Sequence, residues 1–578
     1  MTIKKIEIYS YKYHNTNNKN QIIIMSQKKV KVYPVDIECK IQGVSVVDNY
    51  TCTLNQTDIT TNKNKFYIIQ VLTDGKQYIT YVRYGRIGER GTITTDNHYS
   101  KDSAIDDFYR KYKTKTGNNW QTTTFVKKAG KYFKTEVEYE VDEEEIKKNE
   151  KDPNVPEETL DLRLENLMKL YTDEKTMQNT LISLNIDPKK MPLGKISKAQ
   201  LDSAEKILAD IKSYIDNKNK ISFESSESSE SSEEVKPKKK NTKKVRSASE
   251  SSEEVKPKKK NAKKVHRSRS ESESSEENEE GKKEGKEEDQ EDESLAKDEE
   301  LLTKSSQFYT YIPYCCGRRK PPVIHNMKML GQYTNMIDEL RQLEVAVKVT
   351  KNNRNLVSVY KSLDANITPM SKTCDEWKMI EDYVKYTHAP THRYKIELVD
   401  VYELDRKNEP PTVKETLKKV GNRFLLWHGS RMANFCSIIK NGLILNPESL
   451  NVPIAGKMFG YGVYFANAFS KSFNYCDSGT SNKHACLLLC EVALGNQCKK
   501  LNADVGLTKN KLDKDGYHST WGVGKSTPSK IIKYNKDINV PNGVLKESKV
   551  NGSLLYDEFI AYDTNQISLK YLVVVKQV

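Results

Sequence analysis

The sequence predicts a multidomain α+β protein that consists of a small α+β module, an all-α domain and a mixed α/β domain, in that order. Three changes in the pattern of apolar residues along the chain predict this arrangement. β-type runs followed by one amphipathic helix occupy residues 51–139, helical periodicity governs 158–217 and 301–386, and strands with glycine-marked turns dominate 392–578. A chain of 578 residues has room for roughly three domains of ordinary size, each with its own core.

The charge balance favours a polyanionic partner. The formal net charge is +15, and 30% of the residues are charged. Such an excess of Lys and Arg suits nucleic acid, because binding releases counterions from the phosphates. The alternative is a chain from a lysine-rich proteome, since Lys, Asn, Tyr and Ile are all abundant.

Cysteine spacing and hydropathy argue against several classes of protein. The ten cysteines lack the paired C-x-x-C spacing of a zinc ribbon, so we expect neither a metal site nor a disulfide framework. No apolar run approaches the ~18 residues of a membrane span, and the first residues lack the apolar core of a signal peptide. We therefore expect a soluble intracellular protein that makes no membrane contact.

The α+β module is expected at 40–140, after a basic flexible arm at 1–35 that is rich in Lys and Asn. Residues 66–72 predict a strand, an Asp-Gly turn follows, and 78–86 predict the returning strand. Apolar residues at helical spacing then predict a helix over 101–112.

The all-α domain is expected at 158–386. Its first helix has apolar residues at i, i+3, i+4 and i+7, as one buried face requires: Leu164, Leu167, Met168 and Tyr171. Ser197 starts a further helix, and Gln200 three residues later completes a capping box.

Residues 222–300 interrupt this domain with Ser/Glu/Lys blocks that carry almost no large apolar side chains. A segment that starts at Ser231 recurs from Ser251, but two copies without an apolar face cannot stack into a solenoid. We therefore expect a disordered low-complexity insert. Its lysine runs fit nuclear localisation or non-specific contact with nucleic acid, and a solvated linker is the alternative.

Three short motifs distinguish the last domain, which is expected at 387–578. His428, Tyr464 and Glu558 each lie at the end of, or inside, an apolar β-type run. Together they supply an imidazole, an aromatic face and a carboxylate, and a carboxylate among apolar residues is costly unless it is paired or used. Taken singly, a capped strand end, a core aromatic ring and a structural ion pair are the alternatives.

The three groups suit an enzyme that cleaves the bond between nicotinamide and ribose. Such cleavage passes through an oxocarbenium-like state, which a carboxylate on the ribose 2-hydroxyl stabilises. Gly429 lets a ligand approach the backbone, whose N–H and C=O suit a planar amide. Tyr475 and Tyr464 can sandwich an aromatic ring while Ser472 hydrogen-bonds its polar substituent.

Segments 425–431, 458–466 and 553–558 closely resemble the DNA-damage-dependent poly(ADP-ribose) polymerases. Further stretches resemble other parts of that family: its helical regulatory domain at 192–195 and 308–313, and its tryptophan-glycine-arginine (WGR) module at 54–57, 65–72 and 84–86. The layout resembles the short members of the family, which lack zinc fingers.

The resemblance implies an ADP-ribosyltransferase fold for the last domain, with NAD+ as a consumed substrate and no cofactor. Glu558 would be the catalytic residue, with His428 and Tyr464 beside it and Lys471 assisting near the acceptor. The implied NAD+ contacts are His428, Gly429, Ser430, Asn434, Tyr464, Ser472 and Tyr475.

The resemblance also implies that the module binds DNA, through Tyr84, Arg86, Lys131 and Tyr132. Tyr84 stands where the family has its tryptophan. A structural arginine at a strand end is the alternative for Arg86. Phosphate contacts position a protein without reading sequence, which suits a sensor of broken ends.

On this resemblance we expect a nuclear poly(ADP-ribosyl)transferase that DNA breaks activate, with the helical domain shielding the NAD+ pocket until a break is bound. The expected partners are DNA ends, acceptor proteins that include the enzyme itself and chromatin proteins, and, as an option, an accessory factor. Two alternatives stay open. One is a mono-transferase, if Ile444, at a position where relatives often have a basic residue, blocks elongation. The other is a DNA-end-binding scaffold without turnover, against which the retained His428, Tyr464 and Glu558 argue.

Overall fold

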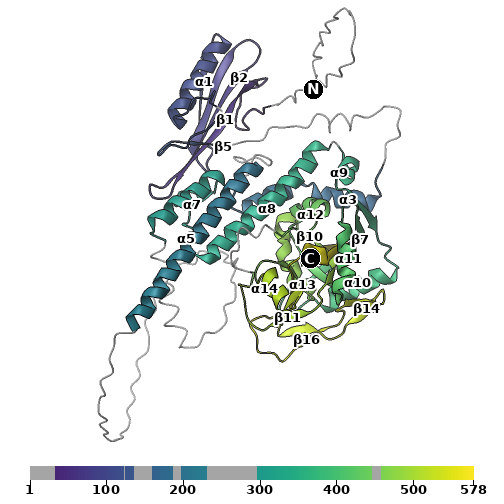
Figure 1. Cartoon of the computed structure of the whole chain (residues 1–578). Helices are drawn as coiled ribbons and strands as arrows, with labels where there is room; N and C mark the ends of the chain where they lie inside the picture. The colour runs from purple at the N-terminus through teal and green to yellow at the C-terminus, as the bar shows by residue number, and fades with distance from the viewer. Residues whose placement is uncertain are drawn as a thin grey trace, which may run out of the picture.

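The computed structural model describes residues 33–122, 124–135, 159–186, 197–230, 296–353, 355–445 and 457–578. Three parts follow one another in the predicted order, and Figure 1 shows the N-terminal module against the helical domain, which packs on the C-terminal domain. Almost all of the predicted arm at 1–35, most of the predicted insert, and residues 192–195 lie outside the described residues. No helix within the described ranges is both long and apolar enough to cross a bilayer.

The N-terminal module is a five-stranded antiparallel sheet of order β4-β3-β2-β1-β5 with a helix packed on one face. Its elements are β1 (Ser45–Asp58), β2 (Lys63–Thr73), β3 (Tyr78–Arg86), β4 (Thr92–His98), α1 (Lys101–Thr116) and β5 (Phe133–Thr135). The predicted strands at 66–72 and 78–86 and the predicted helix are confirmed. The helix α1 ends at Gly117, whose left-handed backbone (φ 72°) closes the last turn.

The helical domain comprises α3 (Leu162–Tyr171), α4 (Glu174–Ser183), α5 (Lys198–Glu230), α7 (Glu299–Tyr311), α8 (Met327–Asn352) and α9 (Leu356–Ser362). The predicted apolar face of α3 is confirmed as buried. The helix α5 continues to Glu230, so the predicted start of the insert at 222 is wrong, as is its end at 300, since α7 begins at Glu299. Residues 222–230 contain neither Pro nor Gly, and nothing in that stretch ends a helix.

The predicted capping box at the start of α5 is confirmed. The Ser197 hydroxyl accepts a hydrogen bond from the Gln200 N–H (3.2 Å), and the Gln200 side chain accepts one from the Ser197 N–H (3.1 Å). Both side chains are buried.

We expect Ser197→Ala to destabilise the first turn of α5 by about 1 kcal/mol, because a backbone donor loses its acceptor. Amide hydrogen exchange in that turn should then be roughly fivefold faster. Ser213→Ala, at an exposed position on the same helix, is the control and should leave this exchange unchanged. Equal exchange in the two variants would mean that the box contributes nothing.

The C-terminal domain is built on two main sheets. The seven-stranded sheet has the order β14-β15-β8-β10-β18-β7-β6, and the four-stranded sheet has the order β11-β12-β17-β9. The larger contains β6 (Ala365–Pro369), β7 (Ile396–Arg406), β8 (Arg423–Gly429), β10 (His484–Ala493), β14 (Ile532–Tyr534), β15 (Ile538–Val540) and β18 (Ile567–Gln577). The smaller contains β9 (Val463–Phe465), β11 (Gln497–Lys500), β12 (Ser519–Gly522) and β17 (Glu558–Ala561), and β13 (Ser526–Pro528) pairs with β16 (Leu545–Glu547).

Within the described part of this domain, the sheets are accompanied by the helices α10 (Asp375–Tyr386), α11 (Pro411–Val420), α12 (Phe435–Asn441), α13 (Phe469–Phe473) and α14 (Lys509–Lys514). The two main sheets meet where Trp427 forms an antiparallel bridge with Ala466. This bridge brings the end of β8 beside β9, and therefore His428 beside Tyr464.

The predicted boundary between the helical and C-terminal domains, at 386/387, is wrong. Strand β6 pairs with β7 from Ala365 opposite Arg406 to Pro369 opposite Tyr402, so it is the edge of the large sheet. The helix α10 buries Trp377 and Tyr383 in the core under that sheet. The error arises because α10 continues the helical pattern of apolar residues. Strand β6 is too short to show the alternation of apolar and polar residues that marks a strand.

Candidate active site

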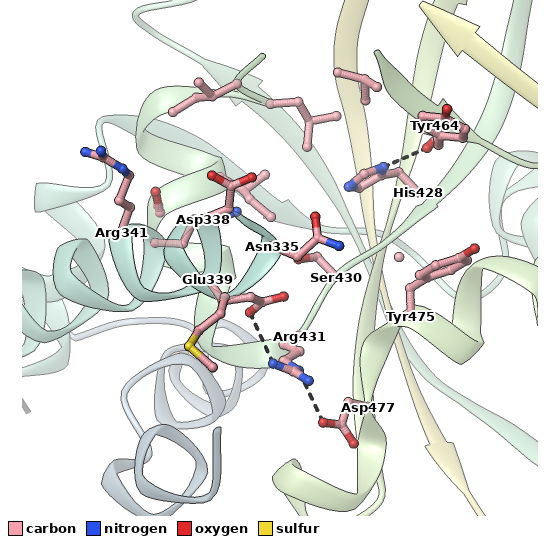
Figure 2. A pocket seen from close by; sticks show the side chains of 18 of the residues that line it. Asn335, Asp338, Glu339, Arg341, His428, Ser430, Arg431, Tyr464, Tyr475 and Asp477 are labelled. Atoms are coloured by element: carbon pink, nitrogen blue, oxygen red, sulfur yellow. Dashed lines mark hydrogen bonds and ion pairs between the residues drawn. The ribbon is translucent and has the colours of Figure 1, made fainter. Parts of the chain in front are cut away.

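A cavity of about 860 Å³ lies between α8 of the helical domain and the edge of the C-terminal domain where β8 meets β9. Five of the predicted site residues line it: His428, Gly429, Ser430, Tyr464 and Tyr475. Figure 2 shows Asn335 and Asp338 of α8 on the side of the cavity that faces His428 and Tyr464. The helical domain therefore forms one wall of the predicted NAD+ pocket.

The imidazole of His428 is held in one orientation. Its Nδ1 lies 3.0 Å from the carbonyl oxygen of Tyr464, and because a carbonyl only accepts, Nδ1 carries the proton. Burial lowers the pKa of His428, and the positive charge of Lys457 lowers it further, although the bond to Tyr464 acts in the opposite direction. The ring is therefore neutral near pH 7 and offers Nε2 as a hydrogen-bond acceptor.

Gly429 is required for a reason that the sequence did not indicate. A Cβ at this position would lie 1.8 Å from the carbonyl oxygen of Ser472, so the backbone of α13 excludes any side chain. Trp427 uses its N–H and C=O on Ala466 (2.9 and 3.0 Å). Successive residues of a strand direct their N–H and C=O groups to opposite edges. Gly429, two residues after Trp427, therefore directs its own N–H and C=O to the same edge as Trp427 does, beyond Ala466.

Tyr464 and Tyr475 line this end of the cavity, whereas Ser472 is buried and does not line it. The Tyr464 hydroxyl donates to the Gly460 carbonyl (2.8 Å) and accepts from the Phe459 N–H (3.0 Å), so its ring is fixed. The Ser472 hydroxyl donates to the Trp427 carbonyl (3.1 Å) and keeps its lone pairs as acceptors. Tyr475 is exposed and lines the cavity, where its ring is accessible to a flat ligand.

Two adjacent carboxylates at the start of β17 differ in how they are satisfied. Asp557 accepts hydrogen bonds from the side chains of Trp521 (3.0 Å) and Asn467 (2.7 Å) and from the backbone of Gly524 (2.8 Å). Glu558 pairs through Oε1 with the Lys471 ammonium at 2.8 Å, whereas its Oε2 is buried without a hydrogen-bond partner. An unpartnered buried oxygen is costly, and a ligand hydroxyl is the kind of donor that Oε2 lacks. Neither Glu558 nor Lys471 lines the cavity in this structure.

Lys471 fixes the position of Glu558. Its ammonium also donates to the Tyr556 carbonyl at 2.9 Å. Burial lowers the pKa of Lys471, and the Glu558 carboxylate opposes that shift. Burial raises the pKa of Tyr464, and the charge of Glu558 raises it further, so the carboxylate acts on that ring.

Asn434 lies under α8 and is bonded to it. Its side-chain amide donates to the Ser430 hydroxyl and to Glu339 of α8, both at 3.0 Å. Arg431 pairs with Asp477 at 3.2 Å and with Glu339 at 3.6 Å, as Figure 2 shows. Helix α8 therefore binds Asn434, which the resemblance implies as an NAD+ contact.

The predicted DNA contacts fall into two groups. Tyr84 and Tyr132 both contact the Tyr67 ring, with centroids 5.9 Å apart in each pair, and Lys131 donates to the Thr114 carbonyl (3.1 Å). Arg86 instead makes structural contacts. Its guanidinium donates to the backbone carbonyls of Asn62, Gly317 and Arg319, so it joins the module to the helical domain.

Sequence reasoning missed the contribution of α8. Asp338 and Glu339 reach the cavity from a helix whose neighbouring Ile337 and Leu340 are buried. The sequence did offer a signal for this, namely two acidic residues between apolar residues of one helix. Carboxylates in such a position are costly to bury unless they have hydrogen-bond or charged partners. Among the described residues, no group of three or more His, Cys, Asp and Glu side chains is arranged to hold a metal ion.

We expect docking of α8 to weaken as the pH rises. Burial raises the pKa of Asp338 to about 7 from 3.8, although the charge of Lys457 lowers it. The docked helix therefore binds the proton more tightly than a helix exposed to water, so docking is strongest below about pH 4 and weakens up to pH 7. Amide exchange in α8, corrected for its intrinsic pH dependence, should show protection falling from pH 5 to 7. Burial also raises the pKa of Glu339 on the same helix, so Asp338→Asn should reduce that dependence without removing it. An unchanged slope in this variant would contradict the assignment.

Three family models match the chain, in the order of its three parts: a WGR domain at 50–127, a poly(ADP-ribose) polymerase regulatory domain at 158–366, and a poly(ADP-ribose) polymerase catalytic domain at 374–577. The end of the second match agrees with the placement of β6 in the C-terminal sheet. The resemblance found in the motifs is thereby confirmed.

Individual relatives match over most of the chain. It is 31% identical to "Poly [ADP-ribose] polymerase 2" of Homo sapiens, over 94% of this chain and 83% of that protein. It is 30% identical to "Poly [ADP-ribose] polymerase 1" of Danio rerio, over 91% of this chain and 45% of that protein. The chain therefore spans less than half the length of the Danio rerio relative.

Proposed function

Because the chain belongs to the poly(ADP-ribose) polymerase family, we propose that it is an NAD+-dependent poly(ADP-ribosyl)transferase activated by DNA strand breaks. It transfers ADP-ribose to itself and to chromatin proteins, releases nicotinamide, and acts in the nucleus in the response to DNA damage. NAD+ is consumed as a substrate, and no cofactor is required. DNA ends are the activating partner, and an accessory factor at the active site is an optional one.

The observation that carries this proposal is the unpartnered Oε2 of Glu558, buried beside an Oε1 that Lys471 holds. A ribose 2-hydroxyl that donates to Oε2 brings the negative charge close to the anomeric carbon. That charge stabilises the cation that develops as the glycosidic bond lengthens. A structural ion pair would have no need of an orphaned oxygen.

The other side chains position the two ends of the reacting bond. The N–H and C=O of Gly429 and the Ser472 hydroxyl bind the carboxamide, and the Tyr475 ring stacks on the nicotinamide. The neutral Nε2 of His428 accepts a hydrogen bond from the adenine-side part of the substrate. The bond between ribose C1 and the ring nitrogen breaks, and its electron pair stays on nicotinamide. The acceptor hydroxyl forms the new C1–O bond and loses its proton to Glu558.

Activation by DNA is proposed to act through the helical domain. In the resting state α8 covers the cavity, and Glu339 holds Asn434 and Arg431. The module contacts α7 directly: Thr57 donates to the Tyr309 carbonyl (3.3 Å), and the Ile59 N–H donates to Ser306 (3.0 Å). DNA that binds the module more tightly when the helical domain is loosened shifts the equilibrium toward an accessible cavity.

The test is automodification of the purified chain with NAD+, with and without a short 5′-phosphorylated DNA duplex, resolved on a gel. A high-mass smear that depends on DNA supports the proposal. A discrete shift identifies a mono-transferase, which Ile444 at the cavity wall favours as the second candidate. DNA binding without NAD+ turnover identifies a scaffold and overturns the proposed activity.

A further inference from the structure

Lys457 is a cationic side chain of the cavity to which the proposed mechanism gives no role. It lines the cavity together with His428 and Asp338, and its ammonium lies 4.6 Å from the centroid of the Tyr461 ring. Its charge acts on both neighbours, because it lowers the pKa of His428 and that of Asp338. The ammonium is therefore close to the imidazole on one side and to α8 on the other.

The chain holds Lys457 in place through the turn that follows it. The Phe459 N–H and the Gly460 carbonyl both bond to the Tyr464 hydroxyl. Lys457 therefore leads directly into a turn anchored on one of the predicted catalytic residues, and the Tyr461 ring supports its ammonium by a cation–π contact. A side chain placed in this way loses little freedom when it binds a ligand.

Among the described residues, two arginines and one lysine line the cavity, and both arginines are already paired. Arg431 pairs with Asp477 and Glu339, and Arg341 pairs with Asp202 and Glu205 of α5. Lys457 forms no ion pair with any described residue; burial lowers its pKa, and the charge of Asp338 opposes that shift. A half-buried ammonium without an ion-pair partner among the described residues is in the state that a phosphate ligand would relieve.

NAD+ carries such an anion, because a pyrophosphate joins its two riboses. Lys457 lines the same cavity as His428, Gly429 and Tyr475, so a substrate with its nicotinamide at Gly429 and Tyr475 extends its remaining part within the cavity that Lys457 lines. We infer that Lys457 binds the pyrophosphate of NAD+. This inference rests on the proposed use of NAD+, and it makes Lys457 a substrate-positioning residue.

The experiment compares two ligands on the full chain bound to a DNA duplex. A carbocyclic NAD+ analogue that cannot be cleaved contains the pyrophosphate, whereas benzamide occupies the nicotinamide end alone. Lys457→Gln should weaken the analogue about 10- to 100-fold, since a charge-assisted contact is lost, and should change benzamide affinity less than twofold. Lys457→Arg should retain most of the affinity for the analogue. Lys414→Gln, at an exposed position on α11, is the matched control and should change neither ligand.

Turnover gives a second readout. Lys457→Gln should raise the KM for NAD+ by a similar factor and leave kcat nearly unchanged, as expected of a contact made equally in ground and transition states.

The outcomes separate this inference from the proposed function. Unchanged analogue affinity in Lys457→Gln, while the wild-type chain binds the analogue, overturns the inference alone. An equal loss of analogue and benzamide binding shows that Lys457 is structural and also overturns it. A wild-type chain that does not bind the analogue overturns the proposed function, and the inference with it.

Discussion

Glu558→Gln is expected to lower the rate of NAD+ turnover about 10²- to 10³-fold, the loss found when one preorganised electrostatic group is removed from an active site. Gln keeps the size of the side chain but replaces a charged oxygen with a neutral amide. The ribose 2-hydroxyl then loses its anionic acceptor, and the attacking hydroxyl loses its base.

This prediction follows from the contacts of the carboxylate. Lys471 neutralises Oε1 at 2.8 Å, while Oε2 has no partner. The substitution therefore removes charge where the reaction needs it. The Lys471 ammonium is the one described donor that loses a charged acceptor, and it still donates to the Tyr556 carbonyl. The fold should remain intact.

Nicotinamide release measured with saturating DNA tests this prediction. Glu547→Gln, an exposed glutamate on β16, is the matched control and should behave as the wild type. Affinity for the DNA duplex should be unchanged in both variants. Wild-type turnover in Glu558→Gln would show that another residue supplies the charge.

The second large effect is a gain of activity. Leu208→Ala is expected to raise NAD+ turnover in the absence of DNA by a factor of about 5 to 70. Leu208 is fully buried in the helical-domain core, where α5 packs on α7 and α8. Truncation of a core leucine costs about 2–5 kcal/mol, and even half of that energy, expressed as local loosening, raises the accessible population by a factor of about 5 to 70.

The measurement is nicotinamide release without and with DNA, accompanied by amide exchange in α8. With DNA the variant and the wild type should converge, because both are then accessible. Ser213→Ala, at an exposed position on α5, is the control. If α8 exchanges faster in Leu208→Ala while basal turnover does not rise, the helical domain does not restrict access to NAD+.

Structural features that depend on residues close together in the sequence could be predicted. The strand Tyr78–Arg86, the helix α1 and the capping box at Ser197 depend on neighbours within a few residues, and all three were predicted correctly. The positions of His428 and Tyr464 followed from motifs at strand ends. The five-residue strand β6 could not be predicted, because its assignment depends on pairing with a strand more than thirty residues away.

Interfaces between domains could not be predicted either. Nothing local in the sequence shows that an arginine contacts another domain, and Arg86 is bound to Gly317 and Arg319. The need for glycine at 429 has a reason that the sequence did not indicate, since the obstacle to a side chain is the backbone of Ser472. In each case the partner is remote in the sequence and the contact exists only once the chain has folded.

The neighbouring carboxylates of β17 also bear on how this protein can change over time. Asp557 ties its strand to Trp521, Asn467 and Gly524, whereas Glu558 contributes an oxygen that the fold itself does not satisfy. Stability and chemistry are thus assigned to separate, successive residues. A lineage can lose the second without losing the first, and its members would persist as well-folded proteins that bind their ligands but no longer react.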